Sequence, residues 1–224
     1  IGVRLVGSEM CIRDRNNIDI WGLLALETVS SSKTELVANH ISNDINPDGG
    51  FWNFGWKQEN PDDPNSSWVI DTDSKLSTCD VTGWGIEALS IAGKNKYSST
   101  IQKAIQYLKD NQNEGFGYSV NPDTQACAVE GLSVYNRESL LNGDYDKNNK
   151  NPIDVLLSFQ NIDKGNFWYY ELGEDNDYAT QDAARAIGTI VNGSVIYKAK
   201  GTKSPDATLT RVENKPSPNP TQPT

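Results

Sequence analysis

Two segments of the chain are rich in aromatic residues that stand beside acidic and amide residues. The aromatic residues concerned are Trp52, Trp56 and Trp68 within 51–78, and Phe167, Trp168 and Tyr169 within 167–177. Flat aromatic rings stack on the apolar faces of a ligand, while carboxylates and amides orient its polar edges. We therefore predict that these aromatics, with Trp84 and Asp123, bind a glycan or another small molecule. The alternative is a structural role, in which the rings only seal seams between helices.

Two acidic loops have the opening of a calcium-binding EF-hand loop. Residues 44–49 read Asp-Ile-Asn-Pro-Asp-Gly, but Gly55 stands at the twelfth position, where a bidentate Glu is needed. Residues 144–148 offer the first three ligand positions but have Val155 at the twelfth. Loops rich in Asp and Asn are usually turns. We therefore predict no metal and no cofactor, with calcium in these loops as the alternative.

The elements that position these segments repeat along the chain. Four segments have a helical spacing of small and apolar residues and end in a small residue followed by Leu or Ile, namely 18–26, 81–89, 124–132 and 179–187. Second helices are predicted between them over 34–45, 100–111 and 152–160. The repeating unit is therefore a helical hairpin that recurs roughly every 40–65 residues.

A turn containing Gly and an aromatic residue follows each second helix. The aromatic residues of these turns are Phe51, Phe116 and Phe167. Glycine allows the backbone to turn, and the ring that follows can fill the seam between two hairpins. Asp80 and Asp123 then stand near the start of the next helix, where a carboxylate caps free N–H groups and complements the helix dipole.

One pattern recurs most clearly at 111–132 and 160–187. It consists of Gln or Asn, a short gap, Gly and then Phe, a polar loop, and a helix that ends in a small residue and Leu or Ile. This pattern resembles the repeat of the squalene cyclase and protein prenyltransferase superfamily of terpenoid cyclase-like proteins. The nearest resemblance is to secreted bacterial surface proteins with degenerate copies of this repeat. It covers 16–193 and implies an all-α fold, a partial α/α toroid of repeated helical hairpins around a central cavity.

The catalytic groups that the resemblance implies are incomplete in this chain. Cyclases of the superfamily protonate an alkene through an Asp-x-Asp-Asp-Thr motif, and the matching segment 78–82 keeps the central Asp80 but neither flanking carboxylate. Prenyltransferases bind zinc through Asp, Cys and a downstream His, whereas the only His, His40, precedes Cys79 and Cys127. We therefore expect no catalytic residue, with Asp80 the first to test, and two buried free thiols.

The composition of the chain argues against two classes of protein, those that bind nucleic acid and those that span a membrane. Thirty acidic and 20 basic residues give a net charge of −10, which argues against nucleic-acid binding. No apolar run reaches the ~18 residues that span a membrane.

Residues 1–15 resemble a translated sequencing adapter and are predicted to be a non-native leader. Residues 194–224 are rich in Pro, Ser and Thr and are predicted to be a linker with further domains C-terminal to it.

These observations favour a non-catalytic module that binds a ligand or partner at the mouth of the cavity. The resemblance, the linker and the acidic composition indicate a secreted or cell-surface bacterial protein. The alternatives are a diverged terpenoid cyclase-like enzyme, an enzyme acting on polysaccharides, and a structural spacer between cell-wall domains. Ligand identity, calcium binding and oligomeric state stay open at this point.

Overall fold

The computed structural model describes residues 16–194, apart from 64, 118–119 and 170–174. The predicted leader over 1–15, and all but the first residue of the predicted linker over 194–224, lie outside the described residues. The elements follow one another as α1 (Asn16–Thr28), α2 (Thr34–Asn43), β1 (Trp52–Gln58), β2 (Trp68–Ser77), α3 (Cys79–Gly93), α4 (Ser98–Asp110), α5 (Pro122–Leu141), α6 (Pro152–Leu157) and α7 (Asp177–Asn192).

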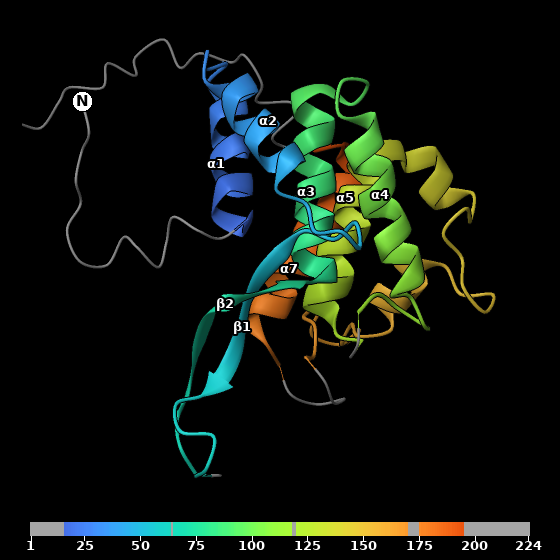
Figure 1. Ribbon diagram of the computed structural model, residues 1–224. Helices are drawn as coiled ribbons and strands as arrows, with labels where there is room; N and C mark the ends of the chain where they lie inside the picture. Colours follow the sequence, from blue (N-terminus) through green and yellow to red (C-terminus); the bar gives the residue numbers. More distant parts are fainter. Residues whose placement is uncertain (1–15, 64, 118–119, 170–174, 195–224) are drawn as a thin grey trace, which may run out of the picture.

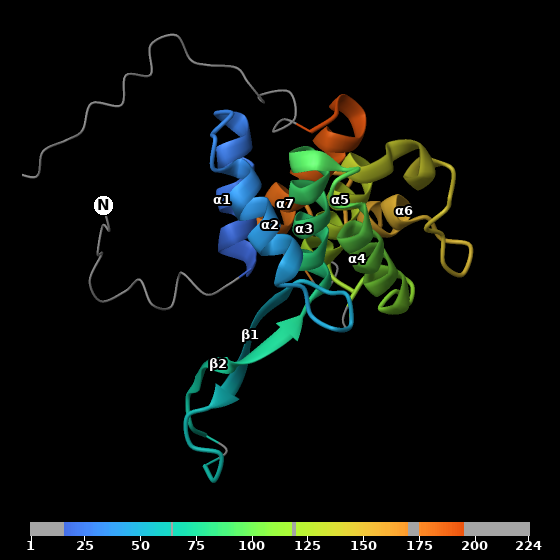
Figure 2. The ribbon, with the colours of Figure 1, turned by 45° about the horizontal axis from the view of Figure 1, so that its top comes forward.

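The expected fold class, an all-α partial toroid, is wrong because the fold is a mixed one of helices and strands. The aromatic-rich segment 51–78, over which no helix or strand was predicted, forms an antiparallel ribbon of β1 and β2 that projects away from the helices (Figures 1 and 2). Its register runs from Trp52 opposite Ser77 to Gln58 opposite Trp68, with an irregularity between Phe54 and Gly55. Aromatic and β-branched residues favour strands, and Trp52, Val69 and Ile70 are such residues in this segment.

The helices pack in two groups on either side of the apolar core. α1, α3, α5 and α7 contact one another in that order and form a row, which we call the helix row. α2 packs against α1 and α3, α4 against α3, and α6 against α5, on the outer side of the row (Figure 2). The four segments predicted as the first helices of the repeat lie within the helix row, and the three predicted second helices overlap α2, α4 and α6.

The Gly-aromatic turns hold the hairpins together, as predicted. Phe51 and Phe116 are fully buried and Phe167 is 2% exposed. Each of their backbone N–H groups donates a hydrogen bond to the side chain at the second position of the next repeat segment: Phe51 to Thr82 Oγ1 (3.0 Å), Phe116 to Gln125 Oε1 (2.8 Å) and Phe167 to Thr180 Oγ1 (2.9 Å). A buried N–H group without a partner is costly, so these bonds fix where each turn meets the helix row.

The caps of the helix row differ from the prediction. The side chain of Asn121, rather than that of Asp123, accepts the N–H of Thr124 at the start of α5 (2.9 Å). In α3 the N-cap residue is Thr78, and Asp80 lies within the first turn. Asp80 and Asp123 therefore complement the helix dipole, but Asp123 does not cap the helix.

Candidate functional site

One face of the helix row carries charged and aromatic side chains from equivalent positions of the repeat. The fourth positions of the aligned segments are Trp21, Trp84, Cys127 and Asp182, and the seventh are Leu24, Glu87, Glu130 and Arg185. Residues three or four apart lie on the same side of a helix, and Asp80 and Asp123 precede their segments by one residue. We call Trp21, Asp80, Trp84, Glu87, Asp123, Glu130, Asp182 and Arg185 the polar face.

Arg185 of α7 contacts residues of the three other helices of the row. Its Nε donates to Glu130 Oε2 at 2.6 Å, and its Nη1 lies 3.0 Å from Asp182 Oδ1. Its guanidinium also lies 5.2 Å from the ring of Trp21 and 6.0 Å from that of Trp84, within the range of cation–π contacts. These two tryptophans meet edge to face at 5.3 Å. The polar face is therefore a packed network and not a set of separate surface charges.

Two buried glutamates lie beneath Arg185. Glu87 is 2% exposed, and burial, together with the nearby charge of Glu130, raises its pKa to about 8. The hydroxyl of Ser194 hydrogen-bonds to Glu87 at 3.1 Å. Burial also raises the pKa of Glu130, although Arg185 and the hydroxyl of Thr189 oppose this shift. Glu87 is therefore largely protonated at neutral pH, while Arg185 stabilises the charge on Glu130.

Three carboxylates, those of Asp80 in α3, Asp123 in α5 and Asp182 in α7, interact through their charges. Burial, followed by the charges of Asp182 and Asp80, raises the pKa of Asp123 to about 6. Burial also raises the pKa of Asp182, with Asp80 acting in the same direction and Arg185 against it. The Oδ1 atom of Asp123, like Trp84 Nε1 and Arg185 Nη2, is buried without a hydrogen-bond partner among the described residues. The polar face thus retains donor and acceptor atoms that its own side chains do not satisfy.

A cavity of about 400 Å³ adjoins the start of α3 and includes Asp80. Its lining residues come from the starts of α3 and α5 and the end of α4 with the turn that follows: Ser77, Thr78, Cys79, Asp80, Tyr107, Asn111, Gly117, Asn121 and Thr124. We call it the Asp80 cavity. Tyr107 donates its hydroxyl to Ser77 O (2.8 Å) and Asn111 donates to Tyr107 O (3.0 Å). Thr78 Oγ1 is buried and has no partner among the described residues.

The predicted aromatic residues do not form one common site. Trp52 and Phe167 are each 2% exposed and belong to the core. Trp168 and Tyr169 are half-buried, and Trp68 is 63% exposed on the ribbon. The side chain of Trp56 lies outside the described residues. Among the described side chains of the predicted set, Phe167 and Tyr169 pack in one cluster of the core, and Trp84 and Asp123 both belong to the polar face.

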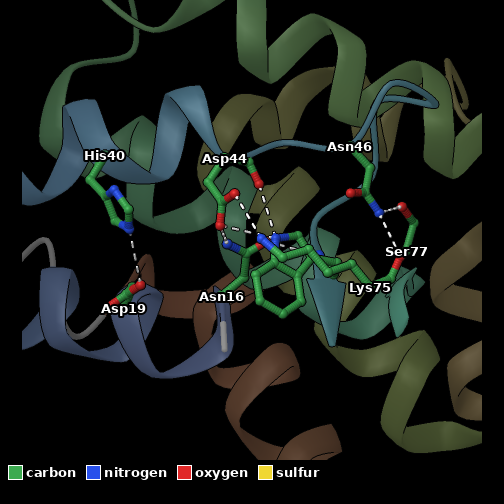
Figure 3. Close-up of polar contacts among 8 residues, drawn as sticks. Asn16, Asp19, His40, Asp44, Asn46, Lys75 and Ser77 are labelled. Atoms are coloured by element: carbon green, nitrogen blue, oxygen red, sulfur yellow. Dashed lines mark hydrogen bonds and ion pairs between the residues drawn. The ribbon is translucent and has the colours of Figure 1, made fainter. Parts of the chain in front are cut away.

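The first acidic loop is held by contacts within the protein. Figure 3 shows the Asp44 carboxylate between Asn16 of α1, whose Nδ2 donates to it at 3.0 Å, and Lys75 of β2 at 3.3 Å. The indole N–H of Trp52 donates to the same carboxylate at 3.0 Å. His40 Nε2 lies 3.5 Å from Asp19 on α1 (Figure 3). Asp44 thus joins α1, α2 and the ribbon, and its oxygens are occupied by donors.

The second acidic loop and the two cysteines of the described residues are the remaining candidates for binding a metal ion. In the second acidic loop, Asp146 Oδ1 accepts from Asn151 at 2.9 Å. Within the described part of the chain, no three His, Cys, Asp or Glu side chains are grouped so that they could hold a metal ion. Cys79 and Cys127 are buried free thiols, as predicted. Burial raises the pKa of Cys79 to about 12 and that of Cys127 well above its ordinary value.

The residues that sequence reasoning missed are Glu87, Glu130, Asp182 and Arg185. A usable signal was present, because Glu87 and Glu130 occupy the same position of two aligned segments that are otherwise uncharged. A charged residue on a buried helix usually has a partner. The identity of that partner, Arg185, could not be inferred, since it stands 55 residues from Glu130 in the sequence.

Comparisons of the chain with protein families, with curated proteins and with solved structures give no match. Among the described residues, no helix combines the length and the apolar character that crossing a membrane requires.

Proposed function

We propose that the protein is a non-catalytic binding module that holds a small, hydroxyl-rich ligand, such as one unit of a glycan, in the Asp80 cavity. The observation that carries the proposal is the lining of this cavity, in which hydroxyls, amides and one carboxylate predominate. Its volume of about 400 Å³ lies within the range of ~300–1,000 Å³ that small-molecule sites have.

The lining matches the chemistry of a sugar. Each sugar hydroxyl donates one hydrogen bond and accepts others, so it needs both donors and acceptors around it. The Asp80 carboxylate only accepts, whereas the Asn111 amide and the Thr124 hydroxyl can do both. Asp123 and Asp182 lie close enough to Asp80 for their charges to interact. This negative field favours neutral sugars and amino sugars over acidic ones.

The test is a calorimetric titration of the protein with neutral, amino and acidic sugars and their short oligomers. We expect a neutral or amino sugar to bind and the acidic sugars to bind more weakly. Asn111→Ala should weaken binding about two- to tenfold, the effect of one hydrogen bond of about 0.5–1.5 kcal/mol. Asn113→Ala is the matched control, because Asn113 is exposed in the same turn and does not line the cavity. Equal affinities of the two variants, or no binding of any sugar, would contradict the proposal.

A second candidate function is favoured by one observation, the pKa of about 6 at Asp123 beside two other carboxylates. Enzymes that cleave glycans use one protonated carboxylic acid and one carboxylate. In that case Asp123 would be the acid, and the protein would act on polysaccharides. Incubation with a panel of polysaccharides should then release sugars, with a rate that falls above pH 6 and is lost in Asp123→Asn. Binding without product release supports the non-catalytic module instead.

The proposal also places the module outside the cell, in a secreted or cell-surface bacterial protein. Support comes from the acidic composition and from the sequence resemblance to squalene cyclase-like repeat proteins of bacterial surfaces. A glycan ligand agrees with that location.

A further inference from the structure

A second cavity, of about 330 Å³, lies between α6 and the turn that precedes α5. It shares no lining residue with the Asp80 cavity. Its apolar lining residues are Val120, Val155 and Phe159, and its polar ones are Glu114, Lys150, Asp154 and Ser158. We call it the α6 cavity. It therefore combines an apolar wall with a charged rim, which differs from the mainly polar lining of the Asp80 cavity.

The walls of the α6 cavity are fixed by buried hydrogen bonds. Gln125 is fully buried; its Oε1 accepts from the N–H of Phe116 (2.8 Å) and its Nε2 donates to Pro152 O (2.7 Å). It thereby ties the turn at 111–117 to the start of α6. Gly115 packs closely here, since a Cβ atom at this position would lie 2.6 Å from Val120 Cγ1 and 3.0 Å from Val155 Cγ1. A preformed cavity binds a ligand without the cost of ordering its walls.

The charges on the rim decide which ligand fits. Lys150 Nζ lies 3.0 Å from Glu114 Oε2, so these two side chains largely neutralise each other. Asp154, exposed in the first turn of α6, adds a second carboxylate to the rim. One lysine thus faces two carboxylates, and the rim is negative. A ligand with a positive group and an apolar body complements both the rim and the wall.

We propose that the α6 cavity binds a small aromatic amine. The ring of the ligand lies against Val155 and Phe159, and its ammonium group lies at Asp154. An aromatic acid fits less well, because its carboxylate would face Asp154 and would compete with Glu114 for Lys150.

The test uses phenethylamine as the probe, followed by NMR titration of the isotope-labelled protein. Its affinity is compared with that of 3-phenylpropionate, which has a similar ring and the opposite charge. We expect the amine to bind at least fivefold more tightly than the acid and to shift resonances of residues 150–160. Asp154→Asn should weaken amine binding about two- to fivefold, as expected for an exposed charge pair.

A pair of neighbouring substitutions locates the ligand. Ser158→Trp should fill the α6 cavity and abolish amine binding, whereas Leu157→Trp should leave it unchanged, because Leu157 is exposed but does not line the cavity. Circular dichroism confirms that both variants are folded. Asn111→Ala, which alters the Asp80 cavity, should also leave amine binding unchanged. The inference is overturned if the acid binds as tightly as the amine, or if Ser158→Trp and Leu157→Trp behave alike. It is also overturned if Asn111→Ala abolishes amine binding.

Discussion

Gly131 of α5 lies directly against the backbone of Gly83 in α3. A Cβ atom added to Gly131 would overlap the carbonyl oxygen of Gly83, and one added to Gly83 would overlap the carbonyl of Cys127. The absence of a side chain at both positions lets the two central helices of the row approach closely. This approach brings Glu87, which lies one turn after Gly83, near enough to Glu130, the residue before Gly131, for their charges to interact.

Gly131→Ala should therefore destabilise the protein strongly. Because backbone atoms cannot move aside as a flexible side chain can, we expect a loss near or above the upper end of the range for overpacking, about 3 kcal/mol. Gly188→Ala is the matched control, since a Cβ atom at Gly188 in α7 meets nothing within 4 Å. That substitution should stabilise the helix by about 0.5–1 kcal/mol. Urea unfolding of both variants makes the comparison, and similar midpoints would argue against the close helix contact.

The buried Glu87 should make stability depend on pH. Its pKa is about 8 in the folded protein and 4.5 when it is exposed, so between these values the folded state holds a proton that the unfolded chain releases. The free energy of unfolding should therefore fall as the pH rises from 4.5 to 8, by up to about 1.4 kcal/mol per unit from this group.

Glu87→Gln, which stays neutral, should flatten this part of the pH profile and raise stability at pH 8 relative to the wild type. Glu59→Gln, at an exposed carboxylate, should retain the wild-type slope. The measurement is chemical denaturation at several pH values. Parallel curves for Glu87→Gln and the wild type would show that Glu87 is not held neutral by burial.

The two thiols should be unreactive in the folded protein. Cys79 is 3% exposed with a pKa of about 12, and Cys127 is 1% exposed with a raised pKa. Since the thiolate is the reactive form, a thiol reagent at pH 8 should react at least about a hundredfold more slowly than with free cysteine. A Cys11→Ser background restricts the assay to these two residues. Rapid labelling of the folded protein would contradict their burial, whereas labelling in denaturant is expected.

Two ribbon tryptophans should respond differently to substitution. Trp52→Phe removes the indole N–H that donates to the Asp44 carboxylate at 3.0 Å, and the loss of a hydrogen bond to a charged group costs about 1.5–3 kcal/mol. Trp68 is 63% exposed, so Trp68→Phe should change stability by less than about 0.5 kcal/mol. Thermal unfolding of the two variants provides the comparison, and equal losses would contradict the different burial of the two rings.

Local patterns in the sequence predicted the helices and the turns that link them. Pro152 begins α6 as expected, since a missing N–H is harmless in the first turn. Phe51, Phe116 and Phe167 fill the seams between hairpins, and each stands one or two residues after a glycine in a predicted turn. These features depend on residues a few positions apart, so a single sequence shows them.

The strands, the polar face and both cavities were decided by tertiary structure. The ribbon was missed because strand pairing joins residues such as Trp52 and Ser77, and neither residue alone specifies its partner. Glu87, Glu130 and Arg185 occupy equivalent positions of their repeat segments, but the sequence does not show which of them meet. Only the packing of α3, α5 and α7 brought Arg185 within 2.6 Å of Glu130 and left Glu87 uncharged. Sequence periodicity reports which side of a helix is buried, whereas the charge of a buried carboxyl depends on the groups that neighbouring helices bring beside it.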